Sequence, residues 1–287
     1  MTCKNENDII EMMKFESEKL NKGAEKMKSK VVKRDFVFTP KGKNRPLHIY
    51  LPAGYDESDE RYPVMYFFDG HNLYYDEDAT YGKSWGMKSF LDKCDKKMIV
   101  VGIECGHEGD ERLSEYLPYK ASGGHFAKFA ANGEETYQWI INEVKPYIDE
   151  TYRTCPFREC TGVGGASMGG LMALYGALHH NDLFSKAACL SCAIGYCMPA
   201  MQEEMKVRTV DSNTRVFLSW GTLEAWGIQN VWQEDVSSMT YGWNKKVADY
   251  LDANDAKSML YSHVGGGHCE KDWEKLVPKF MKFLWMQ

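Results

Sequence analysis

Residues 159–180 read ECTGVGGASMGGLMALYGALHH. Within this stretch, Gly165-Ala166-Ser167-Met168-Gly169 fits the pattern G-x-S-x-G, in which a strand turns sharply into a helix and its central serine takes a positive φ. Glycine is needed on both sides because the backbone two residues before the serine nearly touches the backbone two residues after it. The stretch therefore predicts a nucleophile elbow that presents Ser167. The alternative is a glycine-rich strand-to-helix turn with an incidental serine.

Composition narrows the class of protein. The chain has 287 residues, 44% of them hydrophobic and 26% charged, with a net charge of −6, as expected of a globular protein with a sizeable core. The chain has no basic stripe interleaved with aromatic residues, so nucleic-acid binding is not expected. The first 20 residues lack the apolar core of a secretory signal, and no stretch is long and apolar enough to predict a membrane span. Nine scattered cysteines, Cys189 and Cys192 among them, are expected to be thiols, which favours a cytoplasmic location.

The order of expected elements gives the fold. Residues 1–30 are expected to form a charged, loosely amphipathic helical segment that packs on the domain, mediates a homodimer or is partly mobile. Strand patterns at 35–39 and 46–51 predict a hairpin, and apolar runs then alternate with helical stretches to the end of the chain. About eight strands, mostly parallel and with helices on both faces, match the α/β-hydrolase fold. No linker divides residues 31–287, which predicts a single domain.

A serine nucleophile needs a base, and the base needs an acid to orient it. In this fold the acid and the histidine follow the serine in that order, each on a loop at the carboxyl end of a strand. Glu224 follows the strand RVFLSWG and is the expected acid, with Asp235 or Glu234 as substitutes. His268, in a glycine-rich loop before the last helix, is the expected base, and His263 is its rival. No spacing of the H-E-x-x-H type occurs, so neither a catalytic metal nor another cofactor is expected.

The oxyanion of such a reaction needs two preorganised N–H donors. The backbone amide of Met168, directly after the nucleophile, is the first candidate, and the amide of His71, next to Gly70, is the second. Aromatic residues on loops of the same side are expected to bind a flat or ring-shaped part of a substrate. The candidates for this role are Trp85, Tyr116, Trp226 and Trp232.

Several segments together resemble a known family. They are YPVMYFFDGHNLYYD, YGKSW, VGIECGHEGDERLSEYLPY, EVKPYIDETYRT, GGASMGG, WGTLE and GGGHCEKDW, spread over residues 45–287. In this order they resemble the putative esterase family that includes esterase D, the feruloyl and acetylxylan esterases of carbohydrate esterase family one, and the enterochelin esterases. The resemblance implies Ser167 as nucleophile, His268 as base and Glu224 as acid. It departs at Asp69-Gly70, where many relatives have His-Gly.

These features predict a serine carboxylic-ester hydrolase that works through an acyl-enzyme on small acyl or hydroxycinnamoyl esters of carbohydrates. One alternative is a siderophore lactone esterase of the enterochelin type, which would need basic residues around the cleft. Another is a non-catalytic binding protein on the same fold. The expected partner is therefore a small ester.

Overall fold

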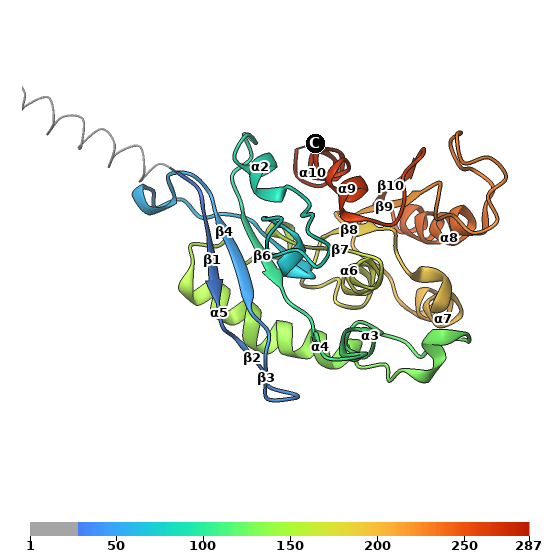
Figure 1. Ribbon diagram of the computed structural model, residues 1–287, viewed down its shortest axis with the longest axis horizontal. Helices are drawn as coiled ribbons and strands as arrows, with labels where there is room; N and C mark the ends of the chain where they lie inside the picture. Colours follow the sequence, from blue (N-terminus) through green and yellow to red (C-terminus); the bar gives the residue numbers. More distant parts are fainter. Residues whose placement is uncertain (1–27, 287) are drawn as a thin grey trace, which may run out of the picture.

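The computed structural model describes residues 28–286, and they are built on one eight-stranded sheet (Figure 1). Its first two neighbouring pairs, β1–β4 and β4–β6, are antiparallel, and all other neighbours are parallel. The strands in spatial order are β1 (Lys30–Arg34), β4 (Leu47–Leu51), β6 (Ile99–Ile103), β5 (Val64–Phe68), β7 (Thr161–Ala166), β8 (Lys186–Leu190), β9 (Arg215–Gly221) and β10 (Lys257–His263). The predicted α/β-hydrolase architecture is confirmed.

The predicted hairpin between residues 35–39 and 46–51 is wrong. Instead β1 pairs with β4, with Lys30 opposite Leu51, and residues 35–46 leave the sheet. Within them β2 (Val37–Phe38) and β3 (Lys43–Asn44) form a separate two-stranded sheet. The pattern of β1, KVVKR, carries the charges that are common on an edge strand, which hid it beside the charged N-terminal segment. The predicted helical segment over residues 1–30 lies almost entirely outside the described residues.

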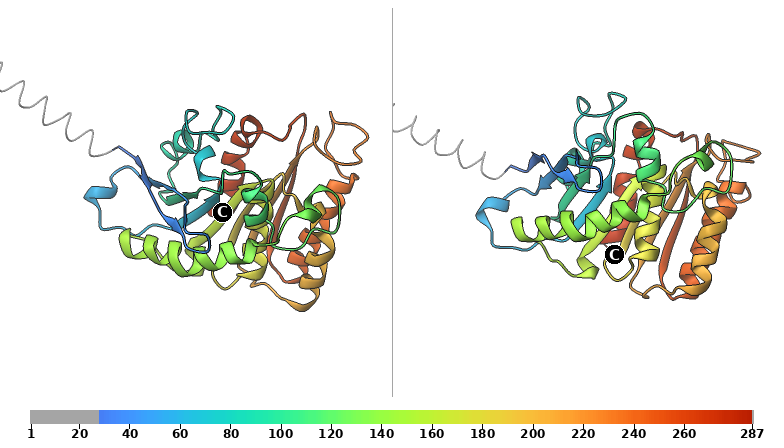
Figure 2. Two further views of the ribbon diagram at one scale, coloured as in Figure 1. Left: turned by 60° about the horizontal axis from the view of Figure 1, so that its bottom comes forward. Right: turned by 90° about the horizontal axis from the view of Figure 1, so that it is seen from below.

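Helices cover both faces of the sheet, as predicted. On one face lie α4 (Gly133–Trp139), α5 (Lys145–Thr151), α6 (Met168–His179), α7 (Met198–Val207) and α8 (Met239–Ala253). On the other lie α2 (Met87–Leu91), α9 (Glu270–Glu274) and α10 (Val277–Trp285). In Figure 1, α10 is above the sheet and α5 below it, and Figure 2 shows the same layers from two other sides. Neighbouring residues of β8 alternate between the two cores, with Ala187 in one and Ala188 in the other.

Prolines explain two irregularities in the helices. The helical stretch from α4 to α5, residues 133–151, is continuous but contains a π-helical turn, Ile140–Val144, just ahead of Lys145 and Pro146. Proline has no N–H to donate there and its ring would crowd the preceding turn, which a wider turn relieves. The expected last helix is divided into α9 and α10 just before Pro278. No helix in the described part of the chain combines the length and apolarity needed to cross a membrane.

Candidate active site

Ser167 lies in the sharp turn between β7 and α6, with φ 58° and ψ −121°. A Cβ on Gly165 would lie 2.5 Å from the backbone of Gly169, so the turn closes only if the earlier position is glycine. The backbone of the next strand holds the turn: the Ser167 N–H donates to the Leu190 carbonyl at 2.9 Å. The Ser167 carbonyl in turn accepts from the Ala193 N–H at 3.1 Å. The structure thus has the strained elbow that the sequence predicts.

Glu224 and His268 meet at the carboxyl ends of β9 and β10. These strands are parallel neighbours, so the loops that follow them emerge at the same edge of the sheet as the elbow. Glu224 Oε2 accepts a hydrogen bond from His268 Nδ1. This contact fixes the imidazole tautomer and leaves Nε2 to act as a base. The His268 side chain is 45% exposed, while Glu224 is largely buried.

Three hydrogen bonds hold the Glu224 carboxylate. Besides His268, Oε1 accepts from Ser191 Oγ at 2.6 Å and from the Gly221 N–H at 2.7 Å. Burial by itself would raise the pKa of Glu224, but these donors outweigh it and the pKa lies below its ordinary value. The carboxylate is therefore ionised at neutral pH and stabilises a positive charge on the imidazole.

Ser191 is a functional residue that the sequence analysis missed. It follows β8 directly, with φ 47°, and its Oγ accepts from Trp273 Nε1 at 2.8 Å while donating to Glu224. The Trp273 ring also packs edge-on against His268, with 5.2 Å between ring centroids. The sequence feature that could have identified Ser191 is its position at the carboxyl end of β8, the strand that follows the elbow. Ser191 and Trp273 thus hold the side chains of Glu224 and His268 in place.

The other acid and base candidates have separate structural contacts. Asp235 is buried, accepts from Trp220 Nε1 at 2.9 Å and from the Ser238 N–H at 3.0 Å, and so fixes the chain just before α8. Glu234 is exposed. His263 ends β10, and its carbonyl accepts from the Thr222 and Gly266 N–H groups. In the described residues Glu224 is the carboxylate that bonds His268.

Ser167, Glu224 and His268 line one cavity of about 430 Å³. Among residues 28–286 no hydrogen bond joins Ser167 to His268, as is common before substrate binds. The rest of the wall is rich in rings and, within the described chain, includes neither lysine nor arginine. The aromatic lining residues are Phe126, Tyr196, Trp220, Trp226 and Trp243.

The four aromatic candidates fall in three different environments. Trp226 lines the cavity, where its ring packs edge-on against Tyr196 at 6.0 Å. Trp85 and Tyr116 are buried instead: Trp85 packs on Trp273, and the Tyr116 hydroxyl accepts from the Asp69 N–H at 3.2 Å. They are core residues, Trp85 in the cluster on one face of the sheet and Tyr116 in the cluster on the other, and the substrate-binding expectation is corrected for both. Trp232 is exposed and lies outside the cavity wall.

The two candidate oxyanion donors follow the carboxyl ends of two neighbouring parallel strands, β5 and β7. Met168 begins α6, so its amide lies at the positive end of that helix. His71 belongs to a 3₁₀ turn, Gly70–Asn72, after β5. A Cβ on Gly70 would lie 2.3 Å from the Gly102 backbone, which requires glycine at this close approach to β6. The His71 side chain points away from the Ser167 cavity and lines a different one. Both amide assignments stay predictions.

Asp69 directly precedes Gly70. It adopts φ 60°, and its carboxylate accepts two hydrogen bonds from the Arg112 guanidinium, at 2.7 and 2.8 Å. A Cβ on Gly169 would lie 3.1 Å from Asp69 Oδ2, so the carboxylate lies against the start of α6. Burial would raise the pKa of Asp69, but Arg112 brings it below its ordinary value. The ion pair thus fixes the loop that carries His71.

Comparisons with known proteins identify the family of the chain. The family model described as "Putative esterase" matches residues 40–285. The uncharacterised protein YbbA of Bacillus subtilis (strain 168) is 27% identical over 187 residues, 64% of this chain and 70% of that protein. An endo-1,4-beta-xylanase/feruloyl esterase of Xylanibacter ruminicola is 27% identical over 161 residues, which are 52% of this chain and only 20% of that protein.

Solved structures share the fold. A ferulic acid esterase superimposes with a TM-score of 0.63 and 16% identity, over 90% of this chain and 98% of its own. The enterobactin esterase from Shigella flexneri superimposes with a TM-score of 0.65 and 17% identity, over 89% of this chain and 59% of its own. At these identities the likeness concerns the fold, and the chemistry depends on the site itself.

Proposed function

The chain belongs to the putative esterase family, and from this premise we propose that it is a serine carboxylic-ester hydrolase that works through an acyl-enzyme. One observation carries the proposal. A serine in a strained elbow and a carboxylate-bound histidine line the same cavity. A cytoplasmic setting is part of the proposal and is supported by the eight cysteines of the described residues, which are all free thiols.

The reaction proceeds in two halves. Ser167 Oγ attacks the ester carbonyl as its proton passes to His268 Nε2, and Glu224 stabilises the imidazolium that forms. The amides of Met168 and His71 donate to the oxyanion, which typically contributes about 10²–10³ in rate for each donor. His268 then protonates the leaving alkoxide. A water molecule, deprotonated by the same imidazole, attacks the acyl-enzyme and releases the acid and free Ser167.

We propose small acyl or hydroxycinnamoyl esters of carbohydrates as substrates. The wall of rings around Trp226 and Trp243 suits stacking on an aryl group or a sugar ring. The absence of lysine and arginine from the described wall suits an uncharged ester. Feruloyl esterase activity in the name of the Xylanibacter ruminicola relative supports the hydroxycinnamoyl group as the first to try.

A lactone esterase of the enterochelin type is the second candidate, because the enterobactin esterase of Shigella flexneri shares the fold. An acidic catecholate ligand would be expected to meet basic side chains in the cavity. The described wall offers none, so this candidate ranks behind the carbohydrate esters.

The test compares the wild-type chain with Ser167→Ala on methyl ferulate, an acetylated sugar and a catecholate lactone. We expect hydrolysis of the first two by the wild type, with kcat/KM lower by at least about 10⁴-fold in the variant. Preference for the lactone would replace the proposed substrate class. Equal activity of the two proteins would overturn the serine mechanism. A folded wild type without activity on any ester would favour a binding protein on this fold.

A further inference from the structure

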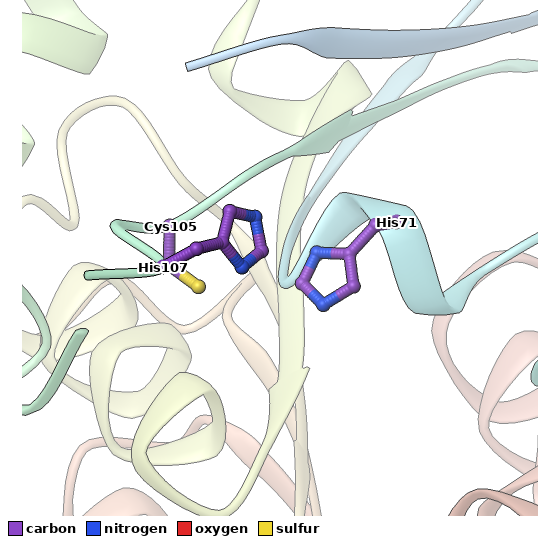
Figure 3. Close-up of side chains that lie close together, drawn as sticks. All are labelled: His71, Cys105 and His107. Atoms are coloured by element: carbon purple, nitrogen blue, oxygen red, sulfur yellow. The ribbon is translucent and has the colours of Figure 1, made fainter. Parts of the chain in front are cut away.

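A second group of reactive side chains lies on the same edge of the sheet, beyond β5 and β6. There a polar cavity of about 490 Å³ is lined by His48, His71, Glu104 and His107, among others. Directly beside it Cys105 follows β6, and Figure 3 shows its sulfur together with the imidazoles of His71 and His107. None of this group lines the cavity of Ser167.

The three side chains each contribute one ligand atom to a small group. One imidazole nitrogen of His71, one of His107 and the sulfur of Cys105 all lie within 4.8 Å of one another. Tetrahedral coordination with bonds of about 2.0–2.3 Å requires ligand atoms about 3.4–3.7 Å apart. The His107 side chain is 54% exposed, so it is free to turn by the remaining distance.

The hydrogen bonds of the two histidines leave one buried nitrogen, Nδ1 of His71, without a partner in the described residues. His71 is only 8% exposed, and its Nδ1 has no hydrogen-bond partner among residues 28–286. Its Nε2 bonds Thr80 Oγ1 at 2.9 Å, while His107 Nε2 bonds Glu104 Oε2 at 2.8 Å. A buried nitrogen without a partner is costly unless something binds it. The His107 contact is of the kind that metal-binding histidines make through their second nitrogen.

We propose that His71, Cys105 and His107 bind one divalent transition-metal ion of the Zn²⁺ type. A thiolate with two neutral imidazoles is a donor set that selects borderline and soft ions over Mg²⁺ and Ca²⁺. Cys105 is buried, and the proton of its thiol leaves to solvent as the sulfur–metal bond forms. A water molecule completes the tetrahedron on the exposed side of His107.

The bound ion would join the loops that follow β5 and β6. His71 comes from the first loop and the other two ligands from the second. Its role is therefore to stabilise the loop that carries one proposed oxyanion donor, and it takes no part in acyl transfer. The proposal depends on the ligand geometry and stands whether or not the chain hydrolyses esters.

A second cluster in the described residues provides a matched contrast. Glu134, His179 and His180 also lie within 4.8 Å of one another. Here one nitrogen of each imidazole bonds a carboxylate: His179 Nδ1 bonds Glu204 at 2.6 Å and His180 Nε2 bonds Glu134 at 2.9 Å. The cluster lacks a sulfur ligand, and none of its buried imidazole nitrogens is without a hydrogen-bond partner in the described residues, so no metal is proposed there.

The test is a Co²⁺ titration of the full-length, tag-free protein under reducing, chelator-free conditions. Absorption would be recorded in the visible region and in the near-ultraviolet region of sulfur-to-cobalt charge transfer. We expect one equivalent to give both sets of bands and one equivalent of Zn²⁺ to remove them. His107→Asn should weaken Co²⁺ binding by about 10–100-fold or more. Cys105→Ser should abolish the charge-transfer band. His179→Asn should change neither the affinity for Co²⁺ nor the charge-transfer band.

Two results would overturn the proposal. One is a wild-type protein, folded by near-ultraviolet circular dichroism, that shows no tetrahedral bands at millimolar Co²⁺. The other is a set of bands that His107→Asn leaves unchanged. Because Cys105 is buried, its variant could fail to fold. The exposed side chain of His107 makes His107→Asn decisive by itself.

Discussion

The two halves of one sheet edge, on either side of the elbow strand β7, use histidine in opposite ways. Beyond β8, β9 and β10 the imidazole of His268 is 45% exposed and bonded through one nitrogen to Glu224. It opens on a cavity whose described wall is mostly apolar. Beyond β5 and β6 the imidazole of His71 is buried, in a group with Cys105 and two further histidines.

The difference shows what turns a histidine into a general base. One ring nitrogen must be fixed by an acceptor, and the other must face a space that a substrate can enter. His268 meets both conditions. His71 has one nitrogen fixed by Thr80, but its other nitrogen faces neighbouring ligand atoms instead of a substrate cavity. The first half is therefore suited to proton transfer, and the second to binding an ion.

Replacing one histidine in each half by alanine should give the largest difference in kcat between two variants. His268→Ala removes the base, and we expect kcat to fall by about 10⁴–10⁶-fold. His107→Ala lies in the other half and, with both proteins assayed metal-free, should leave kcat within about 3-fold of wild type, because the exposed His107 side chain does not line the cavity of Ser167. Steady-state kinetics on the best ester substrate measure both. A comparable loss in both variants would remove the distinction between the halves.

Glu224→Gln should give the second largest effect. We expect kcat to fall by about 10³–10⁴-fold, because the amide no longer fixes the correct tautomer of His268. KM should change little. Asp235→Ala is the control and should keep kcat within a few-fold of wild type. It should instead lower the free energy of unfolding by about 1–3 kcal/mol, since it leaves the buried Trp220 and Ser238 donors without an acceptor. The reverse pattern would make Asp235 the acid.

The loop on the other side of the elbow is held by Asp69, and its contribution should depend on pH. Asp69→Asn should cost about 2 kcal/mol of unfolding free energy at neutral pH, because a charged hydrogen-bonded pair with Arg112 is lost. The pKa of Asp69 is lowered in the folded state, so its stabilisation is complete above about pH 4 and is lost as the pH falls through the folded value. Urea titrations of both proteins at pH 7 and pH 3 measure this, and a pH-independent difference would contradict it.

Ser191→Ala should have a smaller effect. Glu224 keeps the bonds from His268 and the Gly221 N–H, so the acid loses one of three donors. We expect kcat to fall about 10-fold with KM unchanged, the size of one hydrogen bond to a charged group. Ser191→Thr, which keeps the hydroxyl, should recover part of the loss. A rise in KM alone would show that Ser191 contacts substrate instead of positioning Glu224.

Trp226→Ala should have the smallest effect and should depend on substrate. Loss of one stacking ring is expected to raise KM for a hydroxycinnamoyl ester by about 2–10-fold, from about 0.5–1.5 kcal/mol of aromatic contact. KM for a small aliphatic ester should stay unchanged. Trp232→Ala, on an exposed ring outside the cavity, is the control. Equal effects on both esters would argue against a ring-binding role.

The sequence predicted the fold well because local rules govern its parallel half. Buried parallel strands appear in the sequence as continuous apolar runs. The elbow is recognisable because its geometry requires glycine where the backbones of Gly165 and Gly169 approach each other closely. At the antiparallel edge, the charged strand KVVKR does not differ enough from its surroundings to be recognised. The sequence could also predict that Ser167, Glu224 and His268 share one cavity, because each of them follows a strand that ends at the same edge of the sheet.

Contacts between distant segments could not be predicted in the same way. Ser191, Trp273 and Glu224 come from three loops, and no spacing in the sequence relates them. Trp85 and Tyr116 were chosen as loop aromatics, but loop residues also fill the core below the site. The group of His71, Cys105 and His107 likewise appears only when the loops after β5 and β6 are placed side by side.

Reaction with a fluorophosphonate probe, followed by intact mass, tests the central claim most directly. The probe reports an activated serine whatever the natural ester is. We predict one adduct on the wild-type chain, none on Ser167→Ala, and strongly slowed labelling of His268→Ala. A folded wild type that stays unlabelled, or an adduct that persists in Ser167→Ala, would contradict the claim that Ser167, His268 and Glu224 form a working catalytic triad.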